Sequence, residues 1–456
     1  MPKLVTASSQ KMLLTSLFTS CFFLVNCGKE DEGGYYDTSW DVPRNTNIIW
    51  DKTYGGTRHE EIINDLKAAR DGGTLMLVDV STANKLTLVK LDATGSIVWE
   101  KVIDGEKDDS FGTLLEAASG EILVACASNS GVGRDKSDPL IGSTDIWLVK
   151  LDANGNKIWD KTYGGIGTEY VTRILENADG YLLTGTSNSP VSGTKTSENK
   201  GKSDLWIIQL DTDGNVLWDK TIGGDYYDTL NDVLATPDGG YLLSSSSLSG
   251  ATGDKSDPTF GLYDYWIVKL SATGEREWDI SYGTNQDDNA GQLLEWPDGS
   301  YSMIGITNAF TVVGTKESES IGRLDAWLVN FNEGGALNWE RTLGTPGKDL
   351  LSRMVKTTDN RIFVGISTNG VLDFDPNYPE ALYYNGLFME INTSGKVLQE
   401  TIIAGNNTDY LTDFILTQDG NLNAGFISNS EAYGDKSDDT WPKDRDAWLV
   451  KLDLNW

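Results

Sequence analysis

The sequence predicts an all-β protein folded as a seven-bladed β-propeller of four-stranded blades. Three observations predict it. A unit of about 60 residues recurs along the chain, each unit alternates apolar runs with tight turns, and one strand stands alone before the first complete unit. That strand, "IIWDKTYGG" at residues 48–56, reads as the tail of a unit whose beginning is missing.

Tryptophans mark the period of the repeat. One series comprises Trp50, Trp99, Trp159, Trp218, Trp278 and Trp339, with Leu398 in the corresponding place of the last unit. A second series comprises Trp147, Trp206, Trp266, Trp327 and Trp448. One large ring per unit fills the wedge between adjacent twisted sheets, so we expect both series to be core residues rather than a stack around a cofactor.

Each unit contains four predicted antiparallel strands, which we call a, b, c and d. In one unit, residues 170–187 ("YVTRILENADGYLLTGTS") supply strands a and b, and residues 204–224 ("DLWIIQLDTDGNVLWDKTIGG") supply c and d. The Asp-Gly and Asp-x-x-Gly sequences between them tolerate the positive φ of tight hairpin turns. No segment of any length has a helical period.

The strand count predicts how the ring closes. Seven a strands and seven c strands can be counted, but only six d strands follow a c strand. We therefore expect the lone strand at residues 48–56 to pair with the last c strand, which ends near Asp453. This pairing closes the ring and covers two sheet edges. The predicted propeller spans residues 47–456.

The N-terminus resembles a processed lipoprotein leader. Residues 1–26 combine Lys3 and Lys11 with an apolar run too short to span a bilayer, and "LVNC" ends at Cys27, the expected lipidation site. Lipoboxes favour Gly, Ala or Ser directly before the cysteine, and this sequence has Asn26 there. The alternative is therefore an ordinary secretory signal peptide that is cleaved at another position. Residues 27–46 are Gly-rich and acidic, as expected of a tether.

Two resemblances extend this interpretation. The stretch "CGKEDE" after Cys27 resembles the export signal of Bacteroidetes surface lipoproteins. The phrase "VKLDATGSIVW" (residues 89–99) resembles the tryptophan-docking repeat of quinoprotein-type propellers, with one residue fewer between Asp and Gly. Together with "DGGYLL", it is similar to the tandem repeats of Bacteroidetes surface propellers, some labelled bulb-lectin-like. The resemblance implies an outer-membrane, cell-surface protein and neither a settled activity nor a quinone cofactor.

Composition excludes several classes of function. The formal charge of −31 repels nucleic acid and anionic headgroups, so we expect membrane attachment through lipid alone and no nucleic-acid partner. His59 is the single histidine, and Cys126 lies in an apolar strand pattern as an expected core residue, so Ser-His-Asp, Cys-His and His-based zinc sites lack support.

The long b-to-c loops and the d-to-a turns share one face, which we call the long-loop face. It is the expected functional face, because function concentrates on elaborated loops that a rigid scaffold holds. One carboxylate per unit follows the Gly-Gly turn there: Glu61 (or Glu60), Asp109, Glu169, Asp228, Asp288, Asp349 and Asp409. These seven could bind Ca²⁺, or each could accept the backbone N–H groups of its own turn, which once-per-blade recurrence favours. "GDKSD" at Gly253 and Gly434 lacks the spacing of an EF-hand and is interpreted as solvated turns, with calcium binding as the alternative.

Aromatic residues in the same loops are the candidate ligand-binding residues. They are Tyr263, Tyr378, Tyr383, Tyr384, Tyr433 and Trp441, and exposed rings of this kind suit stacking on sugars. The sequence favours a monomeric, non-catalytic scaffold that binds surface proteins or glycans, with no required cofactor. The alternative is a glycan hydrolase or lyase that uses a carboxylate pair on the same face.

Overall fold

The computed structural model describes residues 47–55, 60–80, 83–370, 380–438 and 445–455, all within the unit Asp41–Trp456. These residues form 28 strands and no α-helix. None of the described segments is a helix with the length and apolar character that a membrane span requires. The predicted signal peptide, Cys27 and the tether lie outside the described residues.

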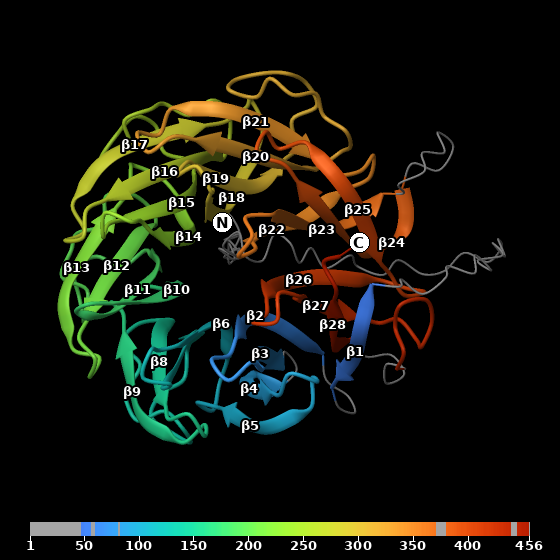
Figure 1. The fold of residues 1–456 in the computed structure, drawn as a ribbon. Coiled ribbons are helices and arrows are strands. Elements are labelled where there is room, and N and C mark those ends of the chain that lie inside the picture. Colours follow the sequence, from blue (N-terminus) through green and yellow to red (C-terminus); the bar gives the residue numbers. More distant parts are fainter. Residues whose placement is uncertain (1–46, 56–59, 81–82, 371–379, 439–444, 456) are drawn as a thin grey trace, which may run out of the picture. The chain divides into compact units, whose positions relative to one another are not determined.

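The strands form seven antiparallel sheets of four around a common centre, which confirms the seven-bladed β-propeller (Figure 1). The innermost a strands are β2 (Glu61–Ala68), β6 (Asp109–Glu116), β10 (Glu169–Asn177), β14 (Asp228–Ala235), β18 (Asp288–Glu295), β22 (Asp349–Lys356) and β26 (Asp409–Leu416). The b strands are β3 (Thr74–Val80), β7 (Ile122–Ser128), β11 (Gly180–Ser187), β15 (Tyr241–Ser247), β19 (Tyr301–Thr307), β23 (Ile362–Gly370) and β27 (Leu422–Ser428).

Strands c and d complete each blade toward the outside. The c strands are β4 (Lys85–Leu91), β8 (Asp145–Leu151), β12 (Asp204–Leu210), β16 (Asp264–Leu270), β20 (Asp325–Phe331), β24 (Glu380–Ile391) and β28 (Asp446–Leu452). The d strands are β5 (Ile97–Ile103), β9 (Lys157–Tyr163), β13 (Val216–Ile222), β17 (Arg276–Tyr282), β21 (Leu337–Leu343), β25 (Val397–Ile403) and, from the start of the chain, β1 (Ile48–Tyr54). We number the blades 1 to 7 from β2.

Strand β1 closes the ring as predicted. It pairs antiparallel with β28 as the outer strand of blade 7, with Thr53 opposite Trp448. The backbone N–H of Asp453 donates to the carbonyl of Asn47 at 2.8 Å. In blade 2 the same bond links Asp152 to Asn156 across the c-to-d turn. The two distant segments therefore reproduce the hydrogen bond of a continuous turn.

Both tryptophan series pack as core, as predicted. Trp147 and its four equivalents in the c strands are fully buried. The d-strand series docks on the glycine of the next blade's c-to-d turn. At Gly155, whose φ is +79°, a Cβ would lie 3.1 Å from the ring of Trp99, so only glycine leaves the ring in place.

One assignment in this series was wrong by one residue. The pairing of β24 with β25 places Gln399 opposite Glu390, just as β20 and β21 place Trp339 opposite Asn330. Gln399, and not Leu398, therefore occupies the tryptophan position, and its amide donates to Glu390 at 2.7 Å. Successive strand residues face opposite sides, which leaves Leu398 exposed on the outer surface.

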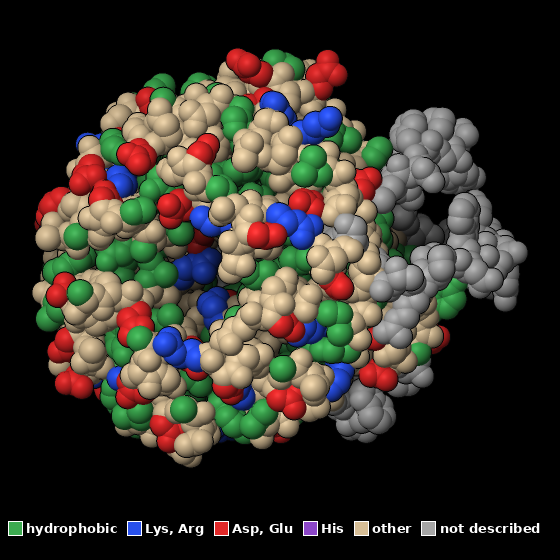
Figure 2. Space-filling model, viewed as in Figure 1, with side chains coloured by type: hydrophobic (Ala, Val, Ile, Leu, Met, Phe, Trp, Pro, Cys, Tyr) green, Lys and Arg blue, Asp and Glu red, His purple; other side chains and the backbone are tan. Residues whose placement is uncertain are grey.

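The inner strands are joined by polar side chains that follow a bulge in each a–b pair. By position these residues are Asp65, Thr113, Arg173, Asp232, Gln292, Arg353 and Asp413. Asp65 accepts the N–H of Leu114 in the next blade at 2.8 Å, and Arg173 Nε lies 2.6 Å from Asp232 Oδ1. Figure 2 shows Lys and Arg side chains around the hollow at the centre of the ring. These links fix neighbouring blades to one another.

Candidate functional site

The long-loop face is one connected surface rather than a set of separate loops. In blades 2 to 5 the b-to-c loop hydrogen-bonds the d-to-a turn that leads to the next blade. Ser143 N–H donates to the Gly167 carbonyl and Lys202 N–H to the Tyr226 carbonyl, both at 2.7 Å, and Arg323 N–H donates to Gly347 at 3.0 Å. Backbone bonds between blades therefore hold the loops in fixed relative positions.

The seven predicted carboxylates begin the seven a strands and are all buried. Asp228 is typical: it accepts the N–H of Gly224 at 2.7 Å and the hydroxyls of Ser247 and Ser249 at 2.5 and 2.9 Å. The N–H four residues earlier is also donated to Asp109, Glu169, Asp288, Asp349 and Asp409. This is the geometry of a turn cap. Glu61 holds the same place in blade 1 and is 8% exposed.

Within the described ranges, no three or more His, Cys, Asp and Glu side chains come together in a way that could hold a metal ion. The cap oxygens already accept N–H and O–H groups, so a cation would have to displace those donors. Calcium binding by the seven carboxylates stays a prediction.

A second set of buried carboxylates was missed. Asp145, Asp204, Asp264 and Asp325 begin c strands, and each accepts backbone N–H groups from the end of its own b-to-c loop. Burial raises the pKa of Asp204 to about 6 and that of Asp264 to about 7, although the N–H bonds oppose the rise. The available signal was an Asp two residues before each c-strand tryptophan.

The interpretation of "GDKSD" as solvated turns was wrong. Lys255 and Lys436 are 3% and 2% exposed, and Lys136, Lys195 and Lys316 are buried at the same position of their loops. Lys136 Nζ lies 5.2 Å from the centroid of the Trp147 ring and donates to the Thr162 hydroxyl at 2.6 Å. Burial lowers the pKa of these lysines, and the surrounding carboxylates oppose the shift. The charge is compensated locally, which explains why a lysine can be buried here.

The residue after each of these lysines donates its backbone N–H to an acid on the outer strand and so connects the loop to that strand. In blade 2, Asp160 of β9 accepts the Ser137 N–H at 2.7 Å and the Trp147 indole N–H at 3.0 Å. Asp219, Asp279, Glu340 and Asp51 accept the indole N–H in the same way in blades 3, 4, 5 and 7. Blades 1 and 6 have Thr87 and Leu387 at the tryptophan position. We call this lysine, tryptophan and acid unit the loop anchor.

Large apolar side chains are exposed above the loop anchors of blades 2 to 5. The most exposed are Phe310 at 67%, Ile166 at 64% and Val132 at 63%. The full set, which we call the apolar loop patch, is Val132, Ile166, Val191, Tyr226, Phe260, Leu262, Phe310, Val312 and Ile321. Val132, Val191 and Val312 each stand four residues before the buried lysine, at equivalent loop tips. A rigid network thus presents apolar groups to solvent on one face.

The predicted loop aromatics do not form one exposed cluster. Tyr263 is half-buried, and this burial raises its pKa to about 12. Tyr384 stacks on Tyr410 with ring centroids 4.6 Å apart, whereas Tyr383 is 39% exposed. Tyr433 is half-buried. Tyr378 and Trp441 lie outside the described residues, as does His59. The predicted set omits Phe260 and Phe310 as well as the aliphatic loop tips, although apolar residues among Gly and Ser in the long loops were a visible signal.

Two groups that could support catalysis, one thiol and one carboxylate pair, are buried. Cys126 is a core residue, as predicted, and burial raises the pKa of its thiol well above the usual range. The fold brings Asp145 and Glu169 together, but both are fully buried beneath the loops. This carboxylate pair is therefore closed to a glycan.

Fold and surface together define a seven-bladed propeller with an apolar loop face. No protein-family model matches the chain. Regulatory protein FlaEY of Caulobacter vibrioides is 25% identical over 234 residues, which cover 45% of this chain and 24% of that protein. The chain thus spans well under half of that relative.

Solved structures similar to this chain include a protein of unknown function from Dyadobacter fermentans, with a TM-score of 0.49, 10% identity, and 90% of this chain and 99% of that chain covered. They also include BBS1N in complex with ARL6DN, with a TM-score of 0.47 and 10% identity; the match covers 91% of this chain and 98% of that chain. The Neurospora crassa Pan2 WD40 domain gives a TM-score of 0.47 and 7% identity, with 90% and 95% covered. The architecture itself rests on the strand pairing described above.

Proposed function

We propose that the protein is a non-catalytic scaffold that binds a partner protein through the apolar loop patch. The observation that carries the proposal is that nine large apolar side chains are exposed on one face of the propeller, in loops and turns of blades 2 to 5 that buried anchors and backbone bonds hold in place. Exposed apolar patches on fixed scaffolds are typical of protein-binding surfaces, where pre-ordered loops reduce the entropy lost on binding.

The partner we expect is a protein with an apolar contact surface and a net positive charge. Six of the nine side chains of the patch are aliphatic, and these bury against other apolar side chains but offer no aromatic face to a sugar. The three rings, Tyr226, Phe260 and Phe310, can pack on a protein as well as stack on a sugar. A chain of formal charge −31 attracts a basic protein over long distances and speeds the encounter. Protein recognition is therefore favoured over glycan recognition.

Capture of partners by matched variants tests the proposal. Wild type, the double variant Ile166→Ser/Phe310→Ser and the control Leu217→Ser would be immobilised and exposed to solubilised outer-membrane proteins, with quantitative mass spectrometry as the readout. Leu217 is 52% exposed on the outer strand β13, away from the patch. We expect proteins bound by wild type and by the control to be lost from the double variant.

Equal capture by all three proteins would refute the role of the patch. A glycan array probed with the same variants separates the alternatives. Glycan binding that the double variant keeps would assign recognition to another surface, and turnover of a bound sugar would support the hydrolase or lyase instead.

We further propose lipid anchoring at the outer face of the outer membrane, with Cys27 as the modified residue. Support comes from the "LVNC" sequence before the modified position and from "CGKEDE" after it. The Cys27→Ala protein is expected in the soluble fraction, and protease treatment of intact cells should digest the wild type. Unchanged membrane association of Cys27→Ala would contradict the anchor.

A further inference from the structure

Two carboxyl groups beneath the apolar loop patch have one oxygen that no hydrogen-bond donor reaches. Asp204 and Asp264 begin the c strands of blades 3 and 4 and are fully buried. In each, Oδ2 accepts a backbone N–H, from Lys200 at 2.5 Å and from Phe260 at 2.7 Å. The other oxygen, Oδ1, makes no hydrogen bond with any residue that the structure describes. Because an ionised oxygen without a donor is costly in such a place, the geometry favours a proton on it.

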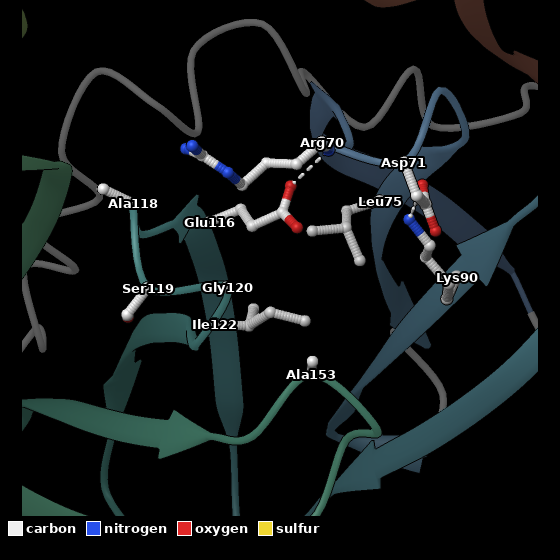
Figure 3. A pocket seen from close by; sticks show the side chains of 10 residues that line it. All are labelled: Arg70, Asp71, Leu75, Lys90, Glu116, Ala118, Ser119, Gly120, Ile122 and Ala153. Carbon is white, nitrogen blue, oxygen red and sulfur yellow. Dashed lines mark hydrogen bonds and ion pairs between the residues drawn. The ribbon is translucent and has the colours of Figure 1, made fainter.

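Buried carboxylates elsewhere in the protein have donors. Figure 3 shows two examples between blades 1 and 2, where Glu116 accepts the Arg70 backbone N–H at 2.8 Å and Asp71 lies 2.5 Å from the Lys90 ammonium. Burial raises the pKa of Asp71, but the bonds from Lys90 and from a turn N–H outweigh it, so the pKa is lowered. Asp264 Oδ1 has no such donor to keep it ionised.

The unpaired oxygen of Asp264 lies at the turn that the next cap holds. A Cβ placed on Gly283 would be 2.0 Å from Asp264 Oδ1. The next residue, Thr284, donates its N–H at 2.6 Å to Asp288, the cap of blade 5. A carboxyl from the c strand of blade 4 and one from the a strand of blade 5 thus meet at one d-to-a turn. The turn after β13 has the same arrangement, with Asp204 and Asp228.

The junction of blades 2 and 3 contains such a pair in direct contact. Its cap, Glu169, is one methylene longer than an aspartate, and its carboxyl hydrogen-bonds that of Asp145. A Cβ placed on Gly164 would be 2.2 Å from Asp145 Oδ1 and 2.6 Å from Glu169 Oε2. Two carboxyl groups can hydrogen-bond each other only when one of them is protonated. This pair therefore shares a proton.

The charges around Asp264 leave room for a proton in the same way. Burial raises the pKa of Asp264 to about 7 and Asp288 adds to the rise, whereas the Phe260 N–H and Lys255 oppose it. Lys255 also faces Asp228, and so its charge is shared. Lys316, from the loop of blade 5, faces Asp288. The other titratable groups facing this cluster are Asp257, Asp279, Asp287 and Tyr265.

We propose that a proton held by Asp264 against Asp288 locks the long loop of blade 4 to the adjacent turn and so orders part of the apolar loop patch. Phe260, whose N–H Asp264 accepts, is 42% exposed in the patch. Leu262, also in the patch, donates its N–H to the Gln286 carbonyl of that turn at 3.3 Å. When the proton leaves for solvent, two buried carboxylates repel each other across the contact and the loop opens more readily. Control of binding by this proton rests on the proposed function of the patch.

Hydrogen exchange of the Phe260 amide in the full-length protein tests the lock. An opened loop returns Asp264 to its ordinary pKa, so opening becomes easier as pH rises from about 4 to 7. Between about pH 5.5 and 7.5 we expect exchange of this amide to increase on the order of tenfold beyond the increase of the intrinsic rate. Mass spectrometry with residue-level fragmentation measures it.

Asp264→Asn supplies the same contacts without a titrating group. Its amide oxygen can accept the Phe260 N–H and its NH₂ can donate toward Asp288, so exchange should follow the intrinsic rate alone. Asp225→Asn is the control, because Asp225 is exposed in a turn of the same face and the Thr252 hydroxyl lowers its pKa. It should behave as wild type does. Asp204→Asn, with the Lys200 amide as reporter, repeats the test in blade 3.

Partner capture at the two pH values tests control of the patch. Wild type and Asp225→Asn should capture severalfold more protein at about pH 5.5 than at about pH 7.5, and Asp264→Asn should capture equally at both. The same pH dependence of exchange in wild type and in both asparagine variants, Asp264→Asn and Asp204→Asn, would overturn the lock. Equal capture by wild type at both pH values would overturn its control of the patch. Absence of capture at both would overturn the proposed function, while the exchange result still decides the lock.

Discussion

The capping role of the inner-strand carboxylates predicts the effect of Asp228→Asn. The native side chain accepts one backbone N–H and two hydroxyls at 2.5–2.9 Å while fully buried. An asparagine keeps one oxygen but turns an NH₂ group toward donors. Leaving a buried donor unpaired costs about 1–3 kcal/mol. The substitution also removes the cost of burying a charged carboxylate, a cost that appears as the raised pKa of Asp228. This gain offsets part of the loss.

We therefore expect Asp228→Asn to lower the free energy of unfolding by about 1–3 kcal/mol. Asp225→Asn is the matched control, because Asp225 lies in the same turn but is exposed, and its substitution should cost under about 0.5 kcal/mol. Urea denaturation followed by tryptophan fluorescence measures both. If the two variants lost equal stability, the cap would not be the reason for the conserved position within the repeat.

The same variant tests the calcium prediction. A turn cap predicts that Ca²⁺ neither releases heat on titration nor raises the melting temperature of wild type or Asp228→Asn. Calcium binding to the wild type that is lost in Asp228→Asn would show that the carboxylate ring is a metal site and would refute the capping explanation.

Three more predictions follow from the buried network and the closed ring. Deleting Ile48–Tyr54 removes the outer strand of blade 7, so we expect the single thermal unfolding transition seen by calorimetry to become broad or to split into several. An unchanged transition would argue against closure of the ring by β1. The pKa of Asp264 is raised to about 7, so between about pH 4 and 7 the folded protein holds a proton that the unfolded chain has lost, and stability should fall as pH rises through this window. The melting temperature should therefore change less between about pH 5 and 8 in Asp264→Asn than in wild type. Asp152→Asn, which replaces a turn residue at the surface, should follow wild type. Lys195→Met should lower the free energy of unfolding by about 3 kcal/mol, because it leaves buried carboxylates without their cation, and the loss should be larger at high pH than at low pH. Lys200→Met, at the surface, should lower it by less than about 1 kcal/mol in the same denaturation assay.

The architecture could be predicted because its signals are local and repeated. Alternation, Asp-Gly turns and tryptophan spacing each depend on residues close in the chain, and the lone strand at residue 48 needed only a count of strands. The error at Leu398 has the same origin. A one-residue shift is invisible in spacing, but it reverses the side of the sheet that a side chain faces.

The buried lysines could not be predicted by the same means. "GDKSD" has the composition of a solvated turn, and a lysine is seldom buried unless it is paired. The ammonium of Lys255 donates to the Asp257 carbonyl within the motif, but the carboxylates that most favour its charge lie outside the motif, Asp264 at the start of the next strand and Asp228 at the start of the blade. The sequence contains each component, but only the folded blade shows that they meet.

Comparison of blades within this one chain separates packing from function. Tryptophan, buried lysine and outer-strand acid occur together in blades 2, 3, 4, 5 and 7, and blades 1 and 6 lack the tryptophan. The outer-strand acid is also present in blades 1 and 6, as Glu100 and Glu400, so it does not depend on the tryptophan. Where the tryptophan is present, the acid accepts its indole N–H, so the recurrence of this pair is explained by packing and says nothing of a ligand. Positions that depart from the repeat are more informative. The loop tips above the anchors expose apolar groups, such as Val132 and Phe310, that the packing of a blade does not need. Binding of a partner, as proposed for the apolar loop patch, accounts for this departure, whereas packing accounts for the loop anchors beneath it.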